Sequence, residues 1–158
     1  MFRLFLTLAI SVPLFAQCRV PDLAPDALER LSPSELVQGG HFLSAVRVLE
    51  PIAKERPQDT QVARLLSRAR AALGDLDEAI KLAESALAAE PSNAAYHVQV
   101  AAVAGRIAEK ASLLKRLTYA RRARQELDVA LALDASNTDA QMGPDDVLFH
   151  RSAAPRRR

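Results

Sequence analysis

Histidines and acidic residues are present in this chain, but their spacing does not build a reaction centre. The chain contains three histidines, His41, His97 and His150. No two of them have the i, i+4 spacing that would place both imidazoles on one helix face as metal ligands. Asp75, Asp77 and Glu78 form an acidic cluster, which helix capping explains more simply than acid–base catalysis. We therefore expect no catalytic residue, no metal site and no cofactor, and we predict that the protein is not an enzyme.

Cationic side chains are the remaining candidates for binding chemistry. Arg64 and Arg68 lie one helical turn apart. Such a pair can hold a carboxylate or an acidic peptide through bidentate hydrogen bonds. The alternative is a solvated helix face without a ligand.

A denser set of cations occupies residues 106–124, where Glu109 is the single acid. After Arg106, this basic patch consists of Lys110, Lys115, Arg116, Arg121, Arg122 and Arg124. It is suited to anionic lipid headgroups, an anionic protein or nucleic acid, unless it is simply a solvated surface. Nucleic acid is disfavoured because Tyr119 is the one aromatic side chain near the patch, and the formal net charge of the chain is only +2.

The N-terminus has the layout of an export signal. Residues 1–16 combine a basic residue, Arg3, with an apolar run and end in a small residue, Ala16. This order is typical of a secretory signal peptide, and the run is shorter than the roughly 20 residues of a membrane-spanning helix. We predict cleavage after Ala16 and an exported protein, either periplasmic or secreted. An apolar helix that stays in the fold is the alternative.

Cys18 follows the predicted signal and allows a second interpretation. Residues 14–18 resemble a bacterial lipoprotein box, whose cysteine is lipidated and anchors the protein to a membrane. Gln17 is larger than the glycine or alanine that this motif prefers before its cysteine, so a free thiol in a flexible leader is the simpler interpretation. Because it is the single cysteine, Cys18 excludes an internal disulfide framework.

The helices that position these residues are clearest in residues 60–93. Two helical patterns meet at Gly74, which suits the left-handed conformation of a helix C-terminus. We expect Asp75 and Glu78 to form a capping box that starts the second helix, and Pro91 to end it. The segment is a helix–turn–helix unit of about 34 residues, which cannot bury its apolar face alone.

Residues 26–59 repeat this pattern in a degenerate form. At an offset of 34, Gly40 matches Gly74, Ala45 matches Ala79, Leu49 matches Ala83, Ile52 matches Ala86, and Pro57 matches Pro91. A short helix over residues 33–40 replaces the first long helix of the unit. Pro51 lies inside the second helix, where we expect it to kink the helix or remove one hydrogen bond.

A third unit covers residues 94–137 and is longer. Its ending, residues 130–137, is similar to residues 86–93 at an offset of 44 instead of 34. About ten residues are therefore inserted, most simply around 108–117, and they either lengthen the hairpin or add a short helix.

Two segments lie outside these repeats. Residues 17–25 are expected to be a linker. Residues 138–158 are expected to form a disordered basic tail, because the helical pattern disappears after Ala140. A natural tail and a truncated repeat are both compatible with this segment.

The positions of Leu66, Gly74, Ala79, Ala86 and Pro91 resemble the tetratricopeptide repeat, which has small residues where its two helices cross. The resemblance implies an all-α fold, a short right-handed α-solenoid of about three helical hairpins, similar to secreted bacterial proteins of this family. It also implies a concave groove lined by the first helix of each unit. The groove residues implied in this way are Gln61, Arg64, Arg68, Val98 and Arg106.

Two functions are compatible with these features. The leading hypothesis is an exported scaffold or adaptor whose groove binds a protein or peptide partner of acidic character. The alternative is a membrane-associated assembly factor, similar to a lipoprotein, that uses Cys18 and the basic patch.

Overall fold

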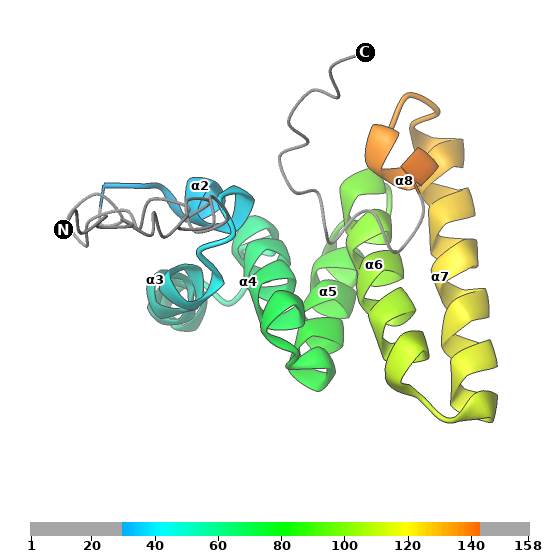
Figure 1. Ribbon diagram of the computed structural model, residues 1–158. Helices are drawn as coiled ribbons and strands as arrows, with labels where there is room; N and C mark the ends of the chain where they lie inside the picture. Colours follow the sequence, from blue (N-terminus) through cyan, green and yellow to red (C-terminus); the bar gives the residue numbers. More distant parts are fainter. Residues whose placement is uncertain (1–29, 143–158) are drawn as a thin grey trace, which may run out of the picture. The chain divides into compact units, whose positions relative to one another are not determined.

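The described part of the chain consists of α-helices joined by short turns. The structure, a computed structural model, describes residues 30–142. Its helices are α2 (Pro33–Gln38), α3 (Phe42–Glu55), α4 (Thr60–Leu73), α5 (Leu76–Ala89), α6 (Ala94–Lys110), α7 (Leu113–Leu133) and α8 (Thr138–Met142) (Figure 1). They form three helical hairpins, α2–α3, α4–α5 and α6–α7, and each helix packs against the next. The predicted all-α solenoid of about three helical hairpins is confirmed.

The turn between α4 and α5 shows how the sequence sets a hairpin. Gly74 has φ = +92°, in the left-handed region. Its N–H donates to the carbonyl of Ala71, and the N–H of Asp75 donates to the carbonyl of Arg70. These two bonds form a Schellman motif, which satisfies carbonyls at the end of α4 and reverses the chain direction.

The capping box predicted at the start of α5 was wrong. The Asp75 side chain makes no capping hydrogen bond to this helix. Instead its Oδ2 accepts a hydrogen bond of 2.8 Å from Nη1 of Arg70. Arg70 also forms an ion pair with Glu50 of α3. A charged partner outcompetes a backbone N–H here, so Asp75 helps join three helices instead of capping one.

A capping box does occur at α2, where the sequence pattern was not recognised. The Ser32 side chain accepts from the N–H of Glu35, and the Glu35 carboxylate accepts from the N–H of Ser32 at 2.7 Å. The Ser32 hydroxyl also donates to the Glu35 carboxylate at 2.6 Å. This bond and the one from the Ser32 N–H lower the pKa of Glu35. The short helix is thereby stabilised in spite of its length. The following helix, α3, runs without interruption through Pro51.

The third hairpin contains the inserted residues entirely as helix. α6 has 17 residues and α7 has 21, whereas α4 and α5 have 14 each. Two residues separate the helices in both hairpins, Gly74 and Asp75 in one and Ala111 and Ser112 in the other. Of the two alternatives, the insertion therefore lengthens the hairpin and adds no separate helix.

The predicted disordered tail was wrong for residues 138–142. These residues form α8, which packs against α7, and Ala140 is buried. Asn137 accounts for the helix start, because its side chain accepts a hydrogen bond from the N–H of Ala140. The remainder of the predicted tail, residues 143–158, lies outside the described residues.

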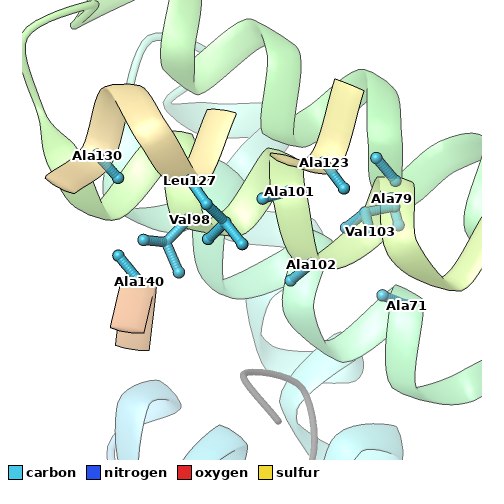
Figure 2. Close-up of a cluster of buried hydrophobic side chains, with 11 residues drawn as sticks. Ala71, Ala79, Val98, Ala101, Ala102, Val103, Ala123, Leu127, Ala130 and Ala140 are labelled. Atoms are coloured by element: carbon cyan, nitrogen blue, oxygen red, sulfur yellow. The ribbon is translucent and has the colours of Figure 1, made fainter. Parts of the chain in front are cut away.

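Alanine dominates the core around α6. In Figure 2, Ala101, Ala102 and Val103 of α6 lie among neighbouring helices, with Ala79 and Ala123 next to each other on one side of Val103 and Ala71 on the other. Every residue from Tyr96 to Gly105 is buried. Small side chains allow helix backbones to approach closely, so α6 packs against α4, α5 and α7 at once.

Candidate functional site

Two arginines and a glutamine occupy one face of α4, which we call the arginine face (Gln61, Arg64 and Arg68). Gln61 is exposed, and both arginines are partly buried. The Gln61 side-chain oxygen accepts from Nε of Arg64 at 3.2 Å and from Nη2 at 3.0 Å. In the described part of the chain, neither guanidinium forms an ion pair with a carboxylate.

The electrostatics of Arg64 reflect this arrangement. Burial lowers the pKa of Arg64, and the charge of Arg68 lowers it further, while Tyr96 and Asp139 act in the opposite direction. Like charges four residues apart on a helix repel each other. The arginine face therefore holds two positive charges whose neutralisation by an anion would be favourable.

The other two residues of the predicted groove do not line an open surface. Val98 is 4% exposed and belongs to the core cluster with Leu127 and Ala140 (Figure 2). Its assignment to the groove was wrong, because α8 adds a contact that the sequence did not reveal. Nη1 of Arg106 donates to the carbonyl of Ala71 at 2.5 Å, so this side chain helps hold α6 against the end of α4.

Polar residues missed by the sequence analysis join the second and third hairpins. The Tyr96 hydroxyl donates to Oγ1 of Thr60 at 2.8 Å, and Thr60 donates to the Glu90 carboxylate at 2.6 Å. Hydrogen bonds from Thr60 and Asn93 lower the pKa of Glu90. Thr60 and Tyr96 are 36 residues apart, close to the repeat length, but periodicity alone does not identify the pair.

A second polar link is fully buried. Ser67 donates to the carbonyl of Ala79 at 2.8 Å and accepts from the side-chain amide of Gln99 at 3.0 Å. Both side chains are buried, at 0% and 4% exposure. Each of the two side chains has a hydrogen-bond partner, so the link helps fix the positions of α4, α5 and α6.

His97 has a structural environment and no open site. Its Nδ1 lies 2.7 Å from Oε2 of Glu126, and its Nε2 lies 2.9 Å from the carbonyl oxygen of Pro91. The two ring nitrogens thus face a carboxylate and a backbone carbonyl, both of which are hydrogen-bond acceptors. His97 thus connects α6 with α7 and with the turn before α6.

The residues of the predicted basic patch differ in their contacts. Arg122 pairs with Glu84 of α5 at 2.5 Å, and Arg116 donates to the carbonyls of Ala108 and Ala111. Lys110 and Lys115 line a pocket of about 350 Å³ together with Gly74, Asp75, Leu76, Asp77, Ile107 and Ala111. Aspartates share this pocket with the lysines, so its charge is mixed.

Arg121 and Arg124 differ from the other members of the patch. Both are exposed, and neither forms a hydrogen bond or ion pair within residues 30–142. Near them, Leu113, Leu114 and Leu117 are 69%, 80% and 49% exposed. These leucines were not predicted as part of a site, although the sequence shows them together as Leu-Leu-Lys-Arg-Leu.

Three further points concern metal binding, membrane-spanning helices and the N-terminal segment. Within residues 30–142, no group of three or more His, Cys, Asp or Glu side chains is placed to hold a metal ion. No helix here is both long enough and apolar enough to cross a membrane. The predicted signal, residues 1–16, and the candidate lipidation site Cys18 lie outside the described residues.

Comparisons with known proteins agree with this architecture. Residues 36–104 match the family model of the tetratricopeptide repeat. A crystal structure of a thermophilic tetratricopeptide repeat protein from Thermus thermophilus superposes with a TM-score of 0.67 at 19% sequence identity, covering 73% of this chain. The chain spans 60% of the length of that structure. No curated protein is significantly similar to this chain.

Proteins with the tetratricopeptide repeat fold generally serve as scaffolds for protein interaction, because stacked hairpins expose extended surfaces. In sequence over residues 36–104, and in fold over most of its length, this chain is therefore similar to tetratricopeptide repeat proteins.

Proposed function

We propose that this protein is an exported scaffold whose arginine face binds an acidic segment of a partner protein. The observation that carries the proposal is the pair Arg64 and Arg68. Both are partly buried on α4, one turn apart, and no carboxylate of the described residues pairs with either. Arg70, which is also partly buried and lies on the same helix, has acidic partners in Glu50 and Asp75.

The chemistry of the arginine face favours carboxylates over other ligands. Guanidinium groups bind carboxylates through paired, charge-assisted hydrogen bonds. Gln61 fixes the guanidinium of Arg64 through two hydrogen bonds, so less side-chain freedom is lost on binding. Asp139 acts to raise the pKa of Arg64, but it forms no ion pair with either arginine of this face.

Peptide binding to full-length protein tests this proposal. Fluorescence anisotropy is measured with labelled peptides that are matched in length and differ in their number of carboxylates. We expect affinity to rise with the number of carboxylates and to fall as salt screens the charges. The double variant Arg64→Glu/Arg68→Glu should weaken binding of the most acidic peptide by about 100-fold or more, because attraction becomes repulsion.

The matched control is Arg47→Glu/Lys54→Glu on α3, two exposed cations whose reversal changes the net charge by the same amount. It should leave binding within about twofold of the unsubstituted protein, since long-range charge is screened. If both double variants weaken binding equally, the attraction is unspecific and the arginine face is not the site. Peptide affinity that does not depend on carboxylates would also contradict the proposal.

Export is the second part of the proposal, and the layout of residues 1–16 supports it. We expect the protein, expressed in a bacterial host, to be recovered outside the cytoplasm with its N-terminus at Gln17. Intact mass spectrometry of the mature protein measures this directly. Full-length protein retained in the cytoplasm would contradict export, and a lipid-modified mature chain that begins at Cys18 would favour the lipoprotein alternative.

A further inference from the structure

The beginning of α7 carries an apolar surface that no described residue covers. Leu113, Leu114 and Leu117 are exposed, and every residue from Ser112 to Thr118 is exposed. The first buried side chain of the helix is Ala123. The first two turns of α7 therefore extend beyond the core, at the end of the lengthened hairpin.

Stability does not account for the leucines. An exposed turn of helix is ordinarily polar on its solvent side, and three neighbouring exposed leucines mark an interaction surface more often than isolated ones do. Their spacing places them on one side of the helix, since residues three and four apart are neighbours. The inserted turns of α7 thus extend beyond the core, and no described residue covers their apolar side.

Cations continue the same side of the helix. Arg121 lies four residues after Leu117, and Arg124 lies seven residues after it. Both arginines are therefore on the same side of the helix as the leucines, about 6 Å and 10 Å from Leu117 along the helix axis. Both are exposed and unpaired within the described range. Asp128, one turn further, is the next acid along this side. We call Leu113, Leu114, Leu117, Arg121 and Arg124 the leucine–arginine stripe.

The positive charge around the stripe limits which partners can bind to it. Residues 110–124 contain six basic residues and no acid, so two copies of the chain would repel each other there. Residues 143–158 have four arginines against two aspartates and would also be repelled. A partner with an anionic surface and an apolar layer beneath it would match both the arginines and the leucines of the stripe.

We propose that the leucine–arginine stripe docks the protein on the surface of an anionic lipid bilayer. The leucines enter the boundary between headgroups and acyl chains, and Arg121 and Arg124 bind phosphate groups. Segments that lie on membranes combine an apolar side of this kind with cations, and their affinity grows with both. A bilayer also fits the projecting shape of a helix start, whereas a protein partner would need a matching cavity. The stripe is separate from the arginine face, so each can fail without the other.

A single tryptophan reports docking at this position. The chain contains no tryptophan, so Leu114→Trp in the full chain gives one fluorophore inside the stripe. We expect its emission to shift to shorter wavelength on vesicles of phosphatidylglycerol and phosphatidylcholine, and to be quenched by brominated acyl chains. Vesicles of phosphatidylcholine alone should cause no shift.

The matched control is Leu133→Trp at the opposite end of α7, where the leucine is 45% exposed. Nineteen residues of helix separate the positions, about 28 Å, and this tryptophan should not respond. Residues 1–16 are present in both proteins, so any vesicle binding by that apolar segment is common to both. Circular dichroism confirms that each variant has its helical content.

Charge reversal completes the test. Added to Leu114→Trp, the pair Arg121→Glu/Arg124→Glu should abolish the spectral shift, while Arg47→Glu/Lys54→Glu should preserve it. The proposal is wrong if anionic vesicles leave the Leu114→Trp emission unchanged, or if both tryptophan positions respond equally. A shift with soluble polyglutamate but not with vesicles would assign the stripe to an acidic protein and would equally overturn it.

Discussion

At the scale of single residues, polar side chains in this protein serve mainly to fix helices against one another. His97, Ser67 and Arg70 each contact two other segments through hydrogen bonds or ion pairs within the chain. Residues of the same chemical types often form active sites. What distinguishes Arg64 and Arg68 is the absence of an acidic partner within residues 30–142, and that difference is visible only in three dimensions.

The contribution of His97 can be measured. We expect His97→Ala to lower the free energy of unfolding by about 2–4 kcal/mol, because it removes two part-buried hydrogen bonds, leaves their partner atoms unpaired and opens a cavity. Glu126→Gln should cost less, about 1 kcal/mol, since the amide keeps the volume and loses the charge. Urea denaturation measures both.

Glu109→Gln is the control for His97, since Glu109 is exposed and should change stability by less than about 0.5 kcal/mol. If His97→Ala matches that control, the hydrogen bonds to Glu126 and Pro91 contribute nothing net.

At the scale of elements, each hairpin depends on its turn, and the α4–α5 turn depends on Gly74. A Cβ at this position would lie 3.7 Å from Nζ of Lys110, an ordinary contact. The effect of Gly74→Ala is therefore conformational, and we expect a loss of about 1–2 kcal/mol from the left-handed φ of +92°. Gly74→Asn should lose less, because asparagine tolerates this region better.

Urea denaturation with an unchanged m-value measures the loss at Gly74. Equal stability of the alanine and asparagine variants would show that the backbone conformation is not the source of the effect.

The helices and the turns between them were the features that the sequence predicted best. The offset of 34 residues, as between Gly40 and Gly74, can be read directly from the sequence, and it predicted the hairpins and their turns. Asp75 was misassigned because Arg70 competes for its carboxylate, and that contact needs the Schellman turn to bring the two together. Val98 was misassigned because α8 reaches it, which depends on packing between segments 42 residues apart.

At the scale of the whole described unit, stability is shared between neighbouring hairpins. α6 contacts α4, α5 and α7, and its buried stretch from Tyr96 to Gly105 consists largely of small residues. In a stacked array of this kind, each hairpin is stabilised by its neighbours. The candidate binding residues lie at positions that this packing leaves available, the arginine face on α4 and the leucine–arginine stripe on α7.

The lengthened third hairpin has a consequence for tolerance to substitution. Its extra residues lie at the end away from the shared core, and a two-residue turn closes it as it closes the second hairpin. Because every residue from Ser112 to Thr118 is exposed, substitutions there should change the free energy of unfolding by about 0.5 kcal/mol or less. The surface of this extension can therefore be altered while the fold is kept.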